Sequence, residues 1–234
     1  MGVDLRQRFR VTSQRMKKYL LALAVSALAL QSTFADWVIV QKSVTDGQTQ
    51  EITMKIKGDK ARADIGVQMS MIVDSATQET VMLMHAQKAM MKMNADSMKS
   101  MMAVAGGLLG GGEPPAKPVA TGQMEKIGEH NCEIFTWSGK MGTGKFWIAK
   151  DFPDAKVLNE IQDKIMKSMG NPQASFAPQA SDFPGVPVKS EMTMMGKTVV
   201  SELVSVKKDT VDATVFILPA DYQEMKMPAA PAKP

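Results

Sequence analysis

The chain has 234 residues, with 28 Lys and Arg against 24 Asp and Glu, a single cysteine and 22 methionines. Six of the basic residues and one of the acidic residues lie in the first 35 positions, so the other 199 residues hold 22 basic and 23 acidic groups, a net charge of −1. That balance excludes the basic surface that a nucleic-acid-binding protein needs. The one cysteine, Cys132, excludes an internal disulfide, so packing of a single large core must hold the fold.

The N-terminal 35 residues have the three parts of a secretory signal peptide. Basic residues between 15 and 18 precede an apolar run at 19–30, and Ala35 ends a stretch of small residues suited to cleavage. A membrane span needs about 20 apolar residues, so we expect removal of this segment and no transmembrane anchor. Met16 begins a complete signal by itself, which predicts that translation starts there. Residue 36 is Asp and not Cys, which predicts a periplasmic or secreted protein that is not a lipoprotein.

Alternation of apolar and polar residues dominates the rest of the chain and predicts short antiparallel strands joined by tight turns. The predicted strands are 52–57, 61–65, 69–73, 81–84, 89–93, 122–127, 132–137, 146–149, 186–194 and 199–207. A last short segment is predicted at 212–218, before Pro219.

Two stretches have the spacing of helices. The stronger one is 154–169, whose apolar residues recur every three or four positions while Lys156, Glu160 and Lys164 fall on the other side. The weaker one is 94–106, which has methionines at helical spacing.

These elements predict an α+β fold. A sheet of about ten antiparallel strands curls, and amphipathic helices bury their apolar sides against it. We therefore expect a single domain at 36–227, a strongly curved, half-open β-barrel with helices on its concave face. Flexible loops are expected near 107–120 and 171–184, where Gly and Pro are frequent, and a disordered tail at 228–234.

Several blocks of the sequence resemble an exported bacterial family, domain-of-unknown-function family 4412. The blocks are 51–65, 72–74, 82–92, 147–153, 185–196 and 203–206. This resemblance implies the half-barrel fold of the LolA/LolB-like lipoprotein-carrier superfamily, whose members hold acyl chains between a curved sheet and a helical lid. No residue here matches the functional positions of the lipoprotein carrier, so the resemblance does not imply its transfer role.

Motifs for catalysis are weak or missing. The segment Gly139–Lys145 matches the start of a phosphate-binding loop, but Phe146 stands where Ser or Thr would hold Mg²⁺ and a strand follows, so a Gly-rich hairpin is the better interpretation. His130 and Cys132 supply two ligands where zinc needs three or four. The sequence therefore predicts a protein that is not an enzyme and has no cofactor.

The methionines leave three interpretations open. They can be plain core, they can line an adaptable apolar cavity, or they can bind Cu(I), because soft sulfur suits a soft ion. The candidate lining residues are Met54, Met69, Met71, Met82, Met84, Trp147, Leu158, Ile161, Met192 and Met194. The candidate copper ligands are Met90, Met93, Met98, Met101 and Met102, with His85.

The leading prediction is a periplasmic binding or carrier protein for a lipid, an acyl chain or another hydrophobic small molecule, with a transient partner in the cell envelope. A methionine-rich Cu(I)-binding protein and a structural envelope protein without a ligand are the alternatives.

Overall fold

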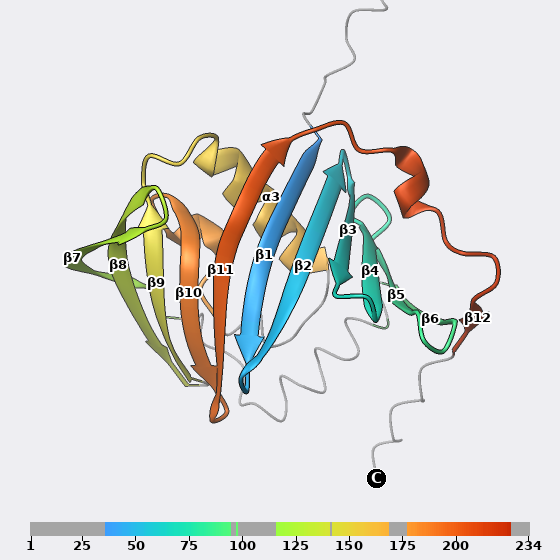
Figure 1. Ribbon diagram of the computed structural model, residues 1–234, viewed down its shortest axis with the longest axis horizontal. Coiled ribbons are helices and arrows are strands. Elements are labelled where there is room, and N and C mark those ends of the chain that lie inside the picture. Colours follow the sequence, from blue (N-terminus) through green and yellow to red (C-terminus); the bar gives the residue numbers. More distant parts are fainter. Residues whose placement is uncertain (1–35, 95–96, 98–115, 141, 169–176, 226–234) are drawn as a thin grey trace, which may run out of the picture. The chain divides into compact units, whose positions relative to one another are not determined.

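One sheet of twelve strands forms the body of the protein, with the helix α3 on one of its faces (Figure 1). The computed structural model describes residues 36–94, 97, 116–140, 142–168 and 177–225, which all belong to the unit Ala35–Pro234. The strands are β1 (Trp37–Thr45), β2 (Gln48–Lys57), β3 (Lys60–Ile65), β4 (Met69–Asp74), β5 (Glu79–Met84), β6 (Ala89–Met93), β7 (Val119–Ile127), β8 (His130–Gly139), β9 (Gly142–Ala149), β10 (Val186–Met194), β11 (Lys197–Lys208) and β12 (Gln223–Glu224). The helical elements are α3 (Ala155–Ser168) and the short 3₁₀ helices η2 (Ala180–Asp182) and η3 (Ala213–Phe216).

Two hairpin meanders make up the sheet. Strands β1 to β6 lie side by side in chain order, and so do β7 to β11. The meanders join where β1 pairs antiparallel with β11, and the short strand β12 pairs parallel with β6 at one edge. The turn between β1 and β2 contains Asp46 and Gly47, with φ of 52° and 76°, and the turn between β10 and β11 contains Met195 and Gly196, with φ of 52° and 79°. Two positive φ values in succession are typical of the type I′ turn, whose twist matches that of the strands.

The structure confirms a largely antiparallel sheet and contains all ten predicted strands. Strands β1 and β12 have no counterpart among those predictions. The helix predicted at 154–169 is α3, and the segment predicted at 212–218 contains η3. Most of the helix predicted at 94–106, most of the loop predicted near 107–120, the signal segment and the tail lie outside the described residues. Of the loop predicted at 171–184, residues 177–184 are described, and they contain η2. Among the described helices, none has the length and apolar character needed to span a membrane.

The strongly curved half-barrel is not what the structure shows. The sheet is open, because its end strands β12 and β7 lie at opposite ends of the strand order, and it does not curl strongly. A sheet of twelve strands at about 4.8 Å spacing is roughly 53 Å wide. A helix the length of α3 is about 21 Å long, too short to cover that width. Apolar packing also occurs on both faces, since the neighbours Trp37 and Val38 on β1 contact different core clusters. Because apolar groups cover both faces, burial of apolar surface does not favour closure of the sheet around either face.

The first face carries α3. Leu158 and Ile165 of the helix are buried against Trp37, Ile56 and Ala61 of the first three strands. Helical spacing places Leu158, Ile161 and Ile165 on one side of α3. The apolar side of α3 therefore packs against the sheet, as predicted. Val157 is an exception, because its side chain is exposed.

The second face is covered by the segment 209–222, which we call the C-terminal strap. Val211 and Phe216 of the strap are buried against Ile72, Val81 and Leu83 of the sheet. At the other end of the sheet, β9 is buried on both sides. Phe146 and Trp147 are neighbours in β9 but belong to different core clusters, which explains the continuous apolar run at 146–149.

A polar network fastens the strap to the sheet. Arg62 donates from Nε to Asp64 Oδ1 (2.6 Å), from Nη1 to the carbonyl oxygen of Val215 (2.9 Å) and from Nη2 to Ser70 Oγ (3.0 Å). Ser70 in turn donates to Asp64 Oδ1 (2.6 Å), which leaves its oxygen to accept from Arg62. His85 lies between Ser70 Oγ, at 2.7 Å from Nε2, and the hydroxyl of Tyr222, at 2.6 Å from Nδ1. Because the only Ser70 proton goes to Asp64, His85 Nε2 must be the donor in its bond to Ser70.

This network makes stability depend on pH. Burial alone raises the pKa of Asp64, but the hydrogen bonds from Ser70, Arg62 and Lys55 outweigh it, and the pKa lies below its usual value. A lowered folded-state pKa adds stability above the unfolded value of about 3.9, and this stability is lost as the pH falls through the folded value. We expect Asp64→Asn to be less stable than the wild type by about 1–3 kcal/mol at pH 7.

The difference between Asp64→Asn and the wild type should shrink at pH 3, as measured by urea unfolding at both pH values. Glu129→Gln, a change at an exposed carboxylate, is the matched control and should leave the pH profile unchanged. A gap between wild type and Asp64→Asn that is as large at pH 3 as at pH 7 would contradict the prediction.

Candidate functional site

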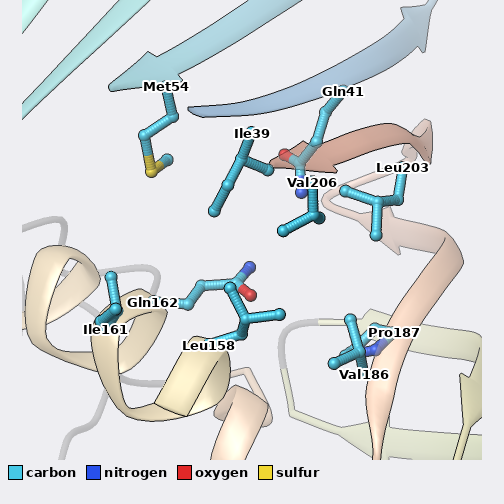
Figure 2. Close-up of a pocket in the computed structure, with 10 residues that line it drawn as sticks. All are labelled: Ile39, Gln41, Met54, Leu158, Ile161, Gln162, Val186, Pro187, Leu203 and Val206. Atoms are coloured by element: carbon cyan, nitrogen blue, oxygen red, sulfur yellow. The ribbon is translucent and has the colours of Figure 1, made fainter. Parts of the chain in front are cut away.

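A small apolar cavity lies between α3 and the middle of the sheet. Figure 2 shows the helix on one side and strands β1, β2, β10 and β11 on the other. Its lining residues are Ile39, Gln41, Met54, Leu158, Ile161, Gln162, Val186, Pro187, Leu203 and Val206. The cavity has a volume of about 30 Å³, somewhat more than the roughly 10–15 Å³ that a cavity needs to hold one water molecule. Eight of the ten lining side chains are apolar, so the site offers water few hydrogen-bond partners.

Register explains how the strands build this wall. Ile39 lies opposite Met54 of β2 and Val206 of β11, so the three side chains share one face. Gln41 lies opposite Leu203, because the pairing of β1 with β11 shifts by one residue between Val40 and Gln41. Positions 203 and 206 would point to opposite faces of a regular strand. The bulge turns both toward the helix.

The helix is fastened to the chain segment that leads into β10. Asn159 is buried and donates from Nδ2 to the carbonyl oxygen of Gly185 (3.0 Å). Asp163 is also buried, and its two carboxylate oxygens accept from the backbone N–H groups of Ala180 (2.8 Å) and Ser181 (3.1 Å). These bonds hold one side of α3 to η2 and Gly185, while the side that carries Leu158, Ile161 and Gln162 lines the cavity.

Polar groups at the cavity are few. Gln41 and Gln162 are the two amide side chains in the lining, and Figure 2 shows both directed into the space between strand and helix. No acid, base or nucleophile lines the cavity among the described residues. The arrangement suits binding of an apolar group with one or two hydrogen bonds, and it offers no acid–base chemistry.

Three of the ten predicted lining residues, Met54, Leu158 and Ile161, line this cavity. Met69, Met71, Met82 and Met84 lie on the same face of the sheet but farther along it, in strands β4 and β5.

The other predicted residues lie toward the β9 end. Trp147 is buried in a separate cluster, with Lys145 and Lys189 Nζ each 4.6 Å from its ring centroid and its Nε1 donating to Glu125 (2.8 Å). Met192 packs near Phe146, and Met194 ends β10.

The remaining seven cavity residues were not predicted. The sequence indicates some of these residues more clearly than others. Ile39 and Gln41 belong to β1, whose apolar alternation begins at Trp37 and is readable in the sequence. The pair Leu203 and Val206 depends on the bulge, which no periodicity reveals.

Among the predicted copper ligands that the structure describes, Met90, Met93 and His85 do not come together at one point. Met90 packs against the cluster under the C-terminal strap, whereas Met93 lies opposite Thr80 on the other face. His85 is bonded to Ser70 and Tyr222 on the strap side. Met98, Met101 and Met102 lie outside the described residues.

Two other sequence features have structural roles. Gly139 and Gly142 pair at the turn between β8 and β9, so the segment that resembles a phosphate-binding loop is a hairpin. Cys132 is fully buried, and burial raises the pKa of its thiol, which disfavours a reactive thiolate. No group of three or more His, Cys, Asp and Glu that could hold a metal ion occurs in the described parts of the chain.

Comparison with solved structures finds neighbours that share little sequence with this chain, one of them at a TM-score of 0.50. An uncharacterized conserved protein from Thermus thermophilus matches with a TM-score of 0.50 and 8% identity, over 85% of this chain and 94% of that one. PNGF-II matches with a TM-score of 0.41 and 15% identity over 83% of this chain, which spans only 31% of PNGF-II. A DUF1329 family protein from Desulfovibrio piger ATCC 29098 matches with a TM-score of 0.33 and 10% identity, over 86% of this chain and 96% of that one.

A search of curated proteins finds no match. The family model described as "Domain of unknown function (DUF4412)" matches residues 34–222, which include every described strand except β12. The chain therefore belongs to the DUF4412 family.

Proposed function

We propose that this protein is an exported, non-enzymatic binding or carrier protein for a lipid, an acyl chain or another hydrophobic small molecule. The guest lies between α3 and the central strands, with α3 as a movable lid. The same proposal includes a periplasmic or secreted location, a transient envelope partner for loading or release, and kinship with the LolA/LolB-like superfamily.

The observation that carries the proposal is the cavity. It is apolar on both walls, it lies at the centre of the sheet, and its only polar lining groups in the described chain are two amides. Burial of an alkyl chain contributes about 0.8 kcal/mol per CH₂ group, so such a site needs no charged partner.

The cavity is small, so α3 must move before a guest can enter. Pockets for small molecules have volumes of about 300–1,000 Å³, ten times or more the 30 Å³ found here. On this proposal the cavity is the closed form of the site, and a guest must push α3 away from the strands. The bonds of Asn159 and Asp163 lie on the side of α3 that faces Gly185 and η2, so the helix can tilt outward about that side while Leu158 and Ile161 leave the sheet.

A substitution that fills the cavity tests the proposal. Val206→Phe adds a ring to the strand wall, and we expect it to reduce binding of a fluorescent fatty acid by about tenfold or more, since the guest and the ring compete for one apolar space. Val204→Phe is the matched control, because Val204 lies on the same strand but is 51% exposed. Fluorescence titration gives the Kd of each protein, and thermal unfolding checks that both variants are folded.

Native mass spectrometry of protein purified from its own host gives a second, independent readout. A co-purifying lipid that is present in Val204→Phe and absent from Val206→Phe supports the proposal. A bare mass for the wild type together with equal probe binding by both variants overturns it and favours a structural envelope protein.

A further inference from the structure

One face of strands β4, β5 and β6 is lined by thioethers. Met69 lies opposite Met84, and Met71 lies opposite Met82, which in turn lies opposite Met91. All five side chains are half-buried. We call this set of five the methionine face.

The register places the methionine face beside the cavity but outside it. Directly paired residues connect Ile39, Met54, Ala63, Met71, Met82 and Met91 in one row across six strands. The first two line the cavity and the last three belong to the methionine face. The neighbouring row contains Ile65, Met69 and Met84. No register shift interrupts these pairings.

In β4 and β5 the methionines lie only on this face, whereas β6 also has Met90 on the strap side. The opposite face of the same two strands, β4 and β5, uses Ile72, Val81 and Leu83, with the buried Ser70. The β-branched Ile72 and Val81 suit a strand, and methionine has no comparable advantage in a sheet. The two faces of β4 and β5 are formed by alternate residues of the same strands. A general preference for methionine in these strands would place it on both faces, so it does not explain the difference between them.

The spacing suits coordination of one ion by several sulfurs. Directly opposite residues of antiparallel strands have Cβ atoms about 4.5–5.5 Å apart. The methionine side chain is unbranched, with three rotatable bonds, so sulfurs from adjacent strands can meet at one point. Neutral thioethers select soft ions such as Cu(I) over Zn²⁺, Mg²⁺ or Ca²⁺.

We propose that the methionine face is a Cu(I) site, in which Met71, Met82 and Met91 bind the ion and Met69 and Met84 supply further sulfur. The metal arrives and leaves as Cu(I), so no electron transfer is required of the protein. This site differs from the copper ligands predicted from the sequence, because it excludes His85, Met90 and Met93. It also stands independently of the carrier function.

The test uses the pair Met71→Leu and Met82→Leu in one protein. Leucine keeps the volume and the apolar character of methionine but removes the sulfur. We expect the wild-type chain to withdraw Cu(I) from the chromogenic chelator bicinchoninate under ascorbate, and to bind Ag(I) as a soft ion that needs no reductant. The double variant should bind Cu(I) at least about tenfold more weakly, since two of three soft ligands have become hydrocarbon.

The control is the pair Met192→Leu and Met194→Leu, two half-buried methionines of β10 outside the methionine face. It should bind Cu(I) as the wild type does. Equal affinity in all three proteins, or no withdrawal of Cu(I) by the wild type, overturns the proposal. Fatty-acid binding is measured on the same samples, and because leucine is apolar it should persist in both pairs, so a failure of the copper site and a failure of the carrier function give different results.

Discussion

Asp163→Ala should lower the free energy of unfolding by about 3 kcal/mol and free η2 from α3. The carboxylate is buried and accepts two backbone hydrogen bonds, from Ala180 and Ser181. Hydrogen bonds to a charged group contribute about 1.5–3 kcal/mol each, and their loss here leaves two N–H groups without acceptors. Urea unfolding measures the change, and hydrogen exchange at 180–183 locates it.

The controls for Asp163 lie at the same position and on the same helix. Asp163→Asn retains one acceptor oxygen, so we expect a loss between those of the wild type and the alanine variant. Glu160→Ala changes an exposed carboxylate of α3, and its effect should stay within about 0.5 kcal/mol.

The lid proposal adds a kinetic expectation for Asp163→Ala. The bonds to η2 fix the side about which α3 tilts, so their loss should let the helix leave the sheet more readily, and the variant should take up a fluorescent fatty acid faster than the wild type does. Unchanged stability together with an unchanged uptake rate would show that Asp163 does not fix the helix.

Arg62→Met is expected to produce the second large effect, on the other face of the sheet. The guanidinium bridges Asp64, Ser70 and the carbonyl of Val215, and so connects the sheet to the C-terminal strap. Methionine retains the apolar stem but leaves the part-buried Asp64 with fewer donors. Removal of one partner from such a pair costs about 2–4 kcal/mol, and the strap should lose protection from hydrogen exchange at 211–222.

Lys88→Met provides the matched comparison for Arg62. Lys88 also contacts the C-terminal segment, through an exposed pair with Asp221 at 2.8 Å, and exposed pairs of this kind contribute little. We expect protection at 211–222 to be nearly unchanged in this variant. Equal loss of protection in Lys88→Met and Arg62→Met would mean that the part-buried network around Arg62 is not what holds the strap.

Local patterns in the sequence predicted the elements of this fold better than their assembly. Alternation such as that of Ile52, Met54 and Ile56 follows directly from a half-buried strand, and the stripe of α3 follows from one apolar side. The pairing of β1 with β11 joins residues more than 150 positions apart, and no local pattern encodes it. The open sheet was missed for the same reason, because curvature depends on what covers each face.

The candidate site shows the same division. Leu158 and Ile161 were predictable, since their side of α3 must meet the sheet. Leu203 and Val206 were not, since a bulge in the pairing with β1 brings them to one face. The abundance of methionine is evident in the sequence, but only the register separates Met82 from Met90, which face opposite sides of the sheet.

The pairing of β1 with β11, which joins the two meanders, also affects the order in which the chain folds. Each meander can form from strands that are close together in the chain. The pairing of β1 with β11 needs two segments that are far apart, Trp37–Thr45 and Lys197–Lys208. Until residues 197–208 are present, β1 and β10 are bare strand edges of the kind that invites wrong pairing between molecules. Contacts between distant segments also slow folding. A nascent molecule therefore passes through a vulnerable interval that ends only when residues 197–208 have emerged.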